Sequence, residues 1–227
     1  MTHKTNPIAY RLGISQQWHA RYLPKHVADM KFMLEEDELL RQAIAKKFKR
    51  AGIEKVDVER SGNVVKVFVH TARPGMIIGH GGSGIEETRK MLTQTVRMFR
   101  KKKKSTQDFV VQLNVEEVRK PEISAQVASE NIALNLEKRL PFRRVIKQSL
   151  EKIISYKEVK GAKISVAGRL NGGDIARTEW VSDGKIPLIT LRSNIDYAEN
   201  RALISQGILG IKVWIYKGEL TDDKQQK

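Results

Sequence analysis

In the first half of the chain, apolar residues recur at two different spacings. Helical spacing, with apolar side chains every three or four residues, follows Asp37, a residue type that often caps a helix. Two segments rich in β-branched residues come next, and the turn Ser61-Gly62-Asn63 between them predicts a β-hairpin. A second helical pattern and an alternating strand complete this half. The expected elements are a helix from Asp37 to about Arg50, strands 53–60 and 64–69, a helix 85–100 and a strand 108–118.

The second half begins after Pro121 with two long helical patterns. Pro141 separates them, so we expect a break there or the first turn of the second helix. Shorter strand-like segments follow, between turns rich in Gly, Asn and Asp. The expected elements are helices 124–140 and 142–160 and strands 162–167, 175–181, 188–191 and 211–216. The predicted fold class is α+β, in which a second α/β domain packs a mostly antiparallel sheet on two helices.

The amino-acid composition indicates which kind of partner the protein binds. The 227 residues include 42 Lys and Arg against 26 Asp and Glu, a formal net charge of +16. Such an excess predicts a polyanion, with nucleic acid as the first candidate and an anionic membrane surface as the second. No segment approaches the ~18 apolar residues of a membrane span, so we expect no membrane partner. Without cysteine, and with five histidines that lack metal-ligand spacing, the sequence predicts no metal, no cofactor and no small-molecule substrate.

The positive charge is concentrated in two places. One cluster lies near the end of the expected helix 85–100, and the other lies around the junction of the two later helices. Either cluster alone is typical of a solvated surface, but the two together with the global excess favour nucleic-acid binding. The members are Arg97, Arg100 and Lys101 to Lys104 in the first cluster and Lys138, Arg139, Arg143, Arg144 and Lys147 in the second.

The segment Gly79-His80-Gly81-Gly82-Ser83-Gly84 allows three interpretations. It matches the G-x-G-x-x-G pattern of a dinucleotide site, but Arg73-Pro74-Gly75 separates it from the preceding strand, and the acidic residue expected about twenty positions later is replaced by basic residues 100–104. It also contains the G-x-x-G of a KH domain, Gly79-His80-Gly81-Gly82, whose glycines let the backbone approach phosphates. A plain glycine turn is the third. We favour the KH interpretation, because the order of the surrounding elements is that of a type II KH fold.

Longer runs resemble one family, that of small-subunit ribosomal protein three. The resemblance spans about residues 4–220, in order and with few gaps. It is most specific in the C-terminal half. The runs that carry it are Asn6–Ile14, His70–Gly79, Glu116–Glu122, Gly168–Trp180 and Gly210–Glu219.

This resemblance implies a single-copy component of the small-subunit head on the cytoplasmic ribosome, neither an enzyme nor a homo-oligomer. Its partners would be small-subunit ribosomal RNA, messenger RNA and neighbouring head proteins of families ten and fourteen. The KH domain would face the channel where messenger RNA enters. The expected organisation is a basic arm 1–33, a KH domain 34–118, a C-terminal domain 119–220 and a disordered tail 221–227.

The resemblance also implies a role for one motif. In the family, an Arg-Arg-x-x-Lys cluster holds and unwinds structured message, and Arg143, Arg144 and Lys147 match it. Their spacing places them on one helix face. A static contact with ribosomal RNA is the alternative.

The glycine loop departs from the family. Where the family usually has Lys or Arg, the loop Gly79, His80, Gly81, Gly82 has His and Gly, which predicts a weaker phosphate clamp. Basic residues elsewhere are expected to contact ribosomal RNA. They are Lys4, Arg11, Arg97, Arg100, Lys101, Lys102, Lys103, Lys104, Arg169 and Arg177. A free-standing KH regulator of messenger RNA is the second candidate function, and an enzyme acting on nucleic acid or a dinucleotide is the third.

Overall fold

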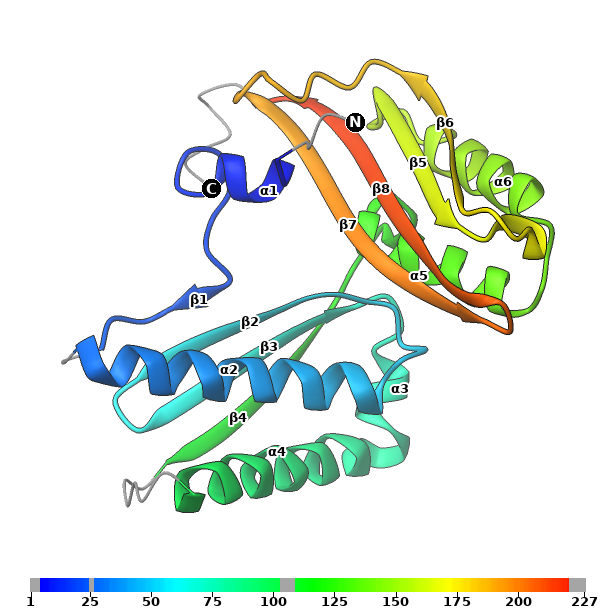
Figure 1. The fold of residues 1–227 in the computed structure, drawn as a ribbon. Coiled ribbons are helices and arrows are strands. Elements are labelled where there is room, and N and C mark those ends of the chain that lie inside the picture. The colour runs from blue at the N-terminus through cyan, green and yellow to red at the C-terminus, as the bar shows by residue number, and fades with distance from the viewer. Residues whose placement is uncertain (1–4, 25–26, 103–108, 221–227) are drawn as a thin grey trace. The chain divides into compact units, whose positions relative to one another are not determined.

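The computed structural model describes residues 5–24, 27–102 and 109–220, without the side chains of Ala28 and Lys102. The chain divides into two compact units, which are considered separately (Figure 1). The KH unit spans His19–Arg119. The C-terminal unit contains residues 120–220 together with the described part of the first 18 residues. The expected tail 221–227 lies outside the described residues.

The KH unit is a four-stranded sheet covered on one face by two long helices (Figure 1). The strand order is β1-β2-β3-β4, with β2 and β3 antiparallel and the two outer pairs parallel. Strand β3 alternates between buried and half-buried residues, so that Val65, Val67 and Val69 point into a core shared with Leu40 and Leu92 of the helices. Its elements are β1 (Ala20–Arg21), α2 (Val27–Lys47), β2 (Ile53–Ser61), β3 (Val64–Thr71), α3 (Gly75–Ile78), η1 (His80–Gly82), α4 (Ser83–Lys102) and β4 (Val110–Glu117).

Helix α2 differs from the prediction at its start. It begins at Val27, so Asp37 lies in the middle of the helix and does not cap it. Asp37 and its neighbour Glu36 are buried, where both carboxylates bind Arg60 of β2. Acidic residues usually mark exposed positions, so two buried carboxylates obscured the helical pattern N-terminal to them.

The C-terminal unit is an antiparallel sheet of order β6-β5-β8-β7, and α5 and α6 pack against one face (Figure 1). This arrangement confirms the predicted mostly antiparallel sheet on two helices. Ile132 and Ile146 of the helices meet Ile164 and Val213 of the sheet in the core. The elements are α1 (Pro7–Arg11), η2 (Pro121–Ile123), α5 (Ala125–Glu137), α6 (Phe142–Ile154), β5 (Gly161–Gly168), η3 (Leu170–Gly172), β6 (Arg177–Gly184), β7 (Ser193–Ile204) and β8 (Gly207–Glu219).

One strand prediction in this unit was wrong, and one strand was missed. The segment 188–191 is not a strand but part of the connection between β6 and β7. The long strand β7 was not predicted, because two of its core-facing residues are the small Ala198 and Ala202, with polar residues between them. Strand β7 pairs with β8 along its whole length, and this pairing stabilises a strand that the pattern of β7 does not predict.

Candidate nucleic-acid interface

The glycine loop connects the short helix α3 to the long helix α4. Gly79, Gly81 and Gly82 all have positive φ angles, of 69°, 63° and 81°, which are backbone conformations that other residues rarely adopt. Gly79 is also packed closely: a Cβ atom there would lie 3.0 Å from the backbone nitrogen of Gly84. The loop therefore needs glycine for its shape, and it holds the start of α4 against α3.

The residues that a phosphate would meet on this loop are exposed. Gly79, His80 and Gly81 are exposed and Gly82 is half-buried. The hydroxyl of Ser83 donates to the carbonyl oxygen of His80 at 2.9 Å, which closes the turn into α4. The loop thus offers backbone to a ligand, and its one titratable side chain is His80.

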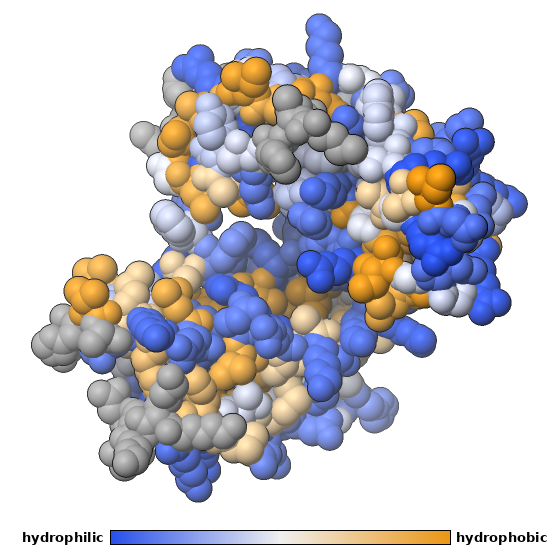
Figure 2. All heavy atoms as spheres, in the orientation of Figure 1, coloured by the Kyte–Doolittle hydropathy of each residue, from blue (hydrophilic) through white to orange (hydrophobic). Residues whose placement is uncertain are grey.

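Helix α6 presents three exposed cations, Arg143, Arg144 and Lys147. Its opposite face is apolar and buried, with Val145 and Ile146 in the core of the unit. Burial of that face fixes the rotation of the helix, so the cations are held toward solvent. We refer to Arg143, Arg144 and Lys147 as the α6 cationic face. Figure 2 shows hydrophilic residues spread over the visible surface of each unit.

One carboxylate lies beside the α6 cationic face. Glu179 of β6 accepts two hydrogen bonds from Arg143, from Nε at 3.1 Å and from Nη2 at 3.3 Å. Arg177 also forms an ion pair with Glu179 at 3.1 Å. The hydrogen bond from Arg143 lowers the pKa of Glu179, so this carboxylate is firmly ionised near neutral pH. Among the described residues, Arg144 and Lys147 have no ion-pair partner.

The remaining predicted RNA contacts fall into three groups. Arg97 and Lys101 are exposed on α4, and Arg169 is half-exposed and pairs with Asp174 at 3.0 Å. Lys4, Lys103 and Lys104 lie outside the described residues, as does the side chain of Lys102. The third group, Arg11 and Arg100, is buried.

The positions of Arg11 and Arg100 correct the expectation that they contact RNA. Arg11 has no exposed surface, and its guanidinium donates to five backbone carbonyl oxygens, three of them in the connection before β7. Arg100 is 8% exposed, and its Nε lies 2.7 Å from Glu36. Both side chains hold the protein together, because burial and protein acceptors occupy the groups that a phosphate would need.

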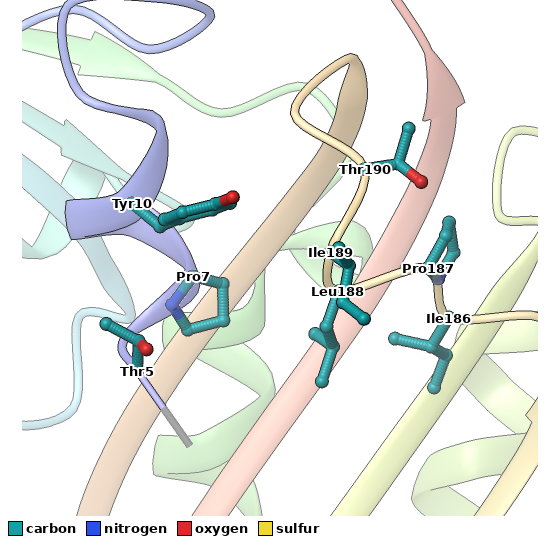
Figure 3. A pocket seen from close by; sticks show the side chains of 8 residues that line it. All are labelled: Thr5, Pro7, Tyr10, Ile186, Pro187, Leu188, Ile189 and Thr190. Carbon is teal, nitrogen blue, oxygen red and sulfur yellow. The ribbon is translucent and has the colours of Figure 1, made fainter.

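A hollow of about 740 Å³ beside α1 was not foreseen from the sequence. Pro7 and Tyr10 of α1 face the connection between β6 and β7 across it, where Leu188 and Ile189 project (Figure 3). Ile189 is 87% exposed, and the lining is mostly apolar. The sequence pattern does not predict this surface, because the surface is formed by two segments that lie about 180 residues apart in the chain.

Comparison with known proteins assigns both units. Residues 39–123 match the model of the KH domain, and residues 132–215 match that of the ribosomal protein S3 C-terminal domain. Small ribosomal subunit protein uS3 of Synechocystis is 44% identical, over 97% of this chain and 87% of the relative. The uS3 of Caldicellulosiruptor bescii is 42% identical over 99% and 96%, and that of Geobacter sulfurreducens 40% identical over 97% and 98%.

A KH unit joined to this antiparallel domain defines a two-domain RNA-binding ribosomal protein. The chain belongs to the family of small ribosomal subunit protein uS3, which confirms the resemblance drawn from the sequence. This is a family of ribosomal proteins and not of enzymes. Along the described residues, no helix is long and apolar enough to cross a membrane.

Proposed function

We propose that this protein is a structural component of the small ribosomal subunit head, where it binds ribosomal RNA and lines the channel by which messenger RNA enters. Membership of the uS3 family supports the ribosomal role. The net charge of +16 supports RNA as the dominant partner, because cations that neutralise phosphates release condensed counterions. The protein acts as a single copy in the cytoplasm, on the ribosome.

The α6 cationic face is the surface that we assign to the incoming message. The observation that carries this assignment is an excess of positive charge at a fixed, exposed site: of the three cations, only Arg143 has a carboxylate partner among the described residues. Lys147 lies four positions after Arg143 on the same helix, a spacing that suits successive phosphates of one strand. Burial of the apolar face of α6 keeps these side chains in place as the message moves.

The proposed unwinding needs no nucleotide hydrolysis by this protein. Base pairs at the end of a duplex open and close spontaneously, and cations that bind the phosphates of a separated strand favour the open state. The translating ribosome then pulls that strand onward. A static contact with ribosomal RNA would use the same side chains but would not distinguish structured from unstructured messages.

Other surfaces receive narrower roles. The glycine loop, with His80 in place of a permanent cation, is proposed to clamp RNA backbone weakly, since histidine is at most partly charged near pH 7. Arg97, Lys101, Arg169 and Arg177 remain proposed contacts to ribosomal RNA. The apolar hollow beside α1 is the surface that we assign to neighbouring head proteins of families ten and fourteen, because its lining offers little to a phosphate.

The unwinding role is tested by replacing Arg143, Arg144 and Lys147 with alanine. Ribosomes carrying this variant should translate messages with stable hairpins more slowly, and unstructured messages at nearly the normal rate. The matched control replaces Lys152, Lys157 and Lys185, exposed residues of the same unit, and so removes the same charge. Equal slowing of both messages would reject unwinding and favour the static contact.

A further inference from the structure

A second, smaller hollow in the C-terminal unit lies at the start of α6. Three connections that are far apart in the sequence meet there: the α5–α6 junction, helix η3 and the β7–β8 turn. The first and last of these lie at the same end of the unit (Figure 1). The volume of about 390 Å³ is at the small end of the range for ligand pockets.

The lining combines an apolar interior with amide groups. Phe142 and Leu209 are each only 3% exposed, whereas Leu140 is 47% exposed at the side. The side chains of Asn171 and Gln206 add carboxamides, which both donate and accept hydrogen bonds. A flat apolar group with donors and acceptors on its edge matches this combination. We call the hollow the α6 pocket.

The backbone around the α6 pocket is held in unusual conformations. Arg139 and Asn171 have φ angles of 61° and 54°, and they are the two non-glycine residues with positive φ along the described chain. Both line the pocket. Arg139 follows the end of α5, where glycine is the residue usually found in this conformation. A cation is therefore kept at a position where glycine would relieve the strain.

Gly172 leaves room for Gln206. A Cβ atom at residue 172, where φ is 76°, would lie 3.3 Å from the amide nitrogen of Gln206. Arg169 donates to the carbonyl oxygens of Gly173, at 3.0 Å, and of Gln206, at 3.4 Å, so the two loops are joined. The backbone of Gln206 is thus tied to the η3 loop, and its side-chain amide lies close beside Gly172.

The α6 pocket adjoins the α6 cationic face. Phe142 lines the pocket, and the guanidinium carbon of the next residue, Arg143, lies 5.7 Å from the centre of its ring. We propose that the α6 pocket receives one unstacked base of an RNA strand whose phosphates lie on the α6 cationic face. The proposal rests on the proposed function, and it adds a reason for strand separation: a base in the pocket is a base removed from its pair.

The chemistry favours RNA over a protein side chain. An aliphatic side chain would use the interior but would leave the amides of Asn171 and Gln206 without partners. The edge of a base satisfies them, and single-stranded bases are the usual target of such recognition. Arg139 lines the pocket and the guanidinium of Arg143 lies beside the ring of Phe142, so both place positive charge where the attached phosphates would lie.

The test uses the full-length protein and two single-stranded RNA oligonucleotides of equal length. In the second, alternate nucleotides lack a base, so both carry the same phosphate charge. Wild-type protein should bind the complete RNA about fivefold more tightly. Leu140→Ser and Gln206→Ala should each reduce this ratio toward one while keeping the affinity for the abasic RNA. Leu203→Ser, a leucine that is 68% exposed and does not line the pocket, is the matched control and should keep the ratio.

Three results would decide against the pocket. A wild-type ratio of one would overturn the proposal, as would pocket variants that keep the wild-type ratio. Pocket variants that keep the ratio but no longer join small subunits would assign the hollow to a protein neighbour. The proposed function fails differently: the alanine variant of Arg143, Arg144 and Lys147 should weaken binding to both oligonucleotides equally, and no change with either would reject the α6 cationic face. Circular dichroism checks that each variant is folded.

Discussion

Two groups of arginines in this protein have the same charge and opposite surroundings. In the KH unit, Arg60 is 6% exposed and contacts two buried carboxylates, Glu36 and Asp37. In the C-terminal unit, Arg143 is 71% exposed and shares one carboxylate with Arg177. The difference teaches that the role of a basic residue depends on how many hydrogen-bond acceptors the protein itself supplies to it. A guanidinium with all its acceptors in place stabilises the fold, whereas one with acceptors to spare is available to RNA.

The buried cluster connects three elements of the KH unit. Arg60 comes from β2, Glu36 and Asp37 from α2, and Arg100 from α4. Each guanidinium has carboxylate partners, and Arg100 also lies 4.3 Å from the ring centre of Phe109. Removal of one member leaves a buried charge without its partner. Such a charge costs far more free energy of folding than the intact pair contributes.

The largest predicted effect is therefore on stability, from Arg60→Met. The substitution keeps an unbranched side chain but leaves the buried carboxylate of Asp37 without its arginine, while Glu36 keeps only Arg100 among the described residues. We expect a loss of about 3–5 kcal/mol in the free energy of unfolding. Urea denaturation followed by circular dichroism measures it. Arg50→Met, at an exposed position after α2, is the control and should change stability by less than about 0.5 kcal/mol. Equal stability of the two variants would break the comparison.

A smaller loss is predicted for Arg11→Met in the C-terminal unit. Arg11 is also buried, but its acceptors are neutral carbonyl oxygens, so its removal strands no charge. We expect a loss of about 1.5–3 kcal/mol, the range for hydrogen bonds to charged groups. Hydrogen exchange should show faster exchange around residues 187–193, which Arg11 connects to α1. If the exchange rate instead rose evenly over the whole unit, Arg11 would not stabilise residues 187–193 locally, as its contacts suggest.

The sequence foretold most of the fold because the main elements have clear periods. The predicted hairpin forms from β2 and β3, the predicted alternation appears in β4, and the glycine loop lies between α3 and α4 where the KH order requires it. Two of the failures have one cause. Asp37 was read as a cap and β7 was missed, since each departs from the polarity that its environment would normally impose.

The candidate sites were less predictable than the fold. Charge alone grouped Arg11 and Arg100 with the RNA contacts, because a sequence does not display which carbonyls or carboxylates will surround a side chain. The α6 pocket needs three loops to meet, and no local pattern records that meeting. The position of Glu179 could have been suspected: alternation along β6 places it on the face of the sheet that α6 covers, opposite to Trp180.

The smallest predicted effect tests the comparison at the exposed arginine, Arg143. Glu179→Gln removes the carboxylate that occupies Arg143 and Arg177, and an amide of similar shape replaces it. If the acceptors supplied by the protein set the role of an arginine, this change should raise the affinity for single-stranded RNA, by about two- to fivefold at low salt and less at high salt. Filter binding at several salt concentrations measures it. Glu151→Gln, at an exposed position on the same helix as Arg143, is the control for lost negative charge.

The dependence of this effect on pH separates competition from a general charge effect. Because the hydrogen bond from Arg143 lowers the pKa of Glu179, the wild-type carboxylate stays ionised throughout the neutral range and continues to compete with phosphate. The advantage of Glu179→Gln should then be constant between about pH 6 and 8 and should shrink only in acid, as the pH falls through the lowered pKa and the wild-type carboxylate is protonated. An advantage that the Glu151→Gln control reproduces would mean that net charge, and not the occupied guanidinium, governs RNA binding at α6. A lower affinity of Glu179→Gln would mean that Glu179 positions Arg143 for the phosphate, so that an acceptor supplied by the protein would be part of the RNA site.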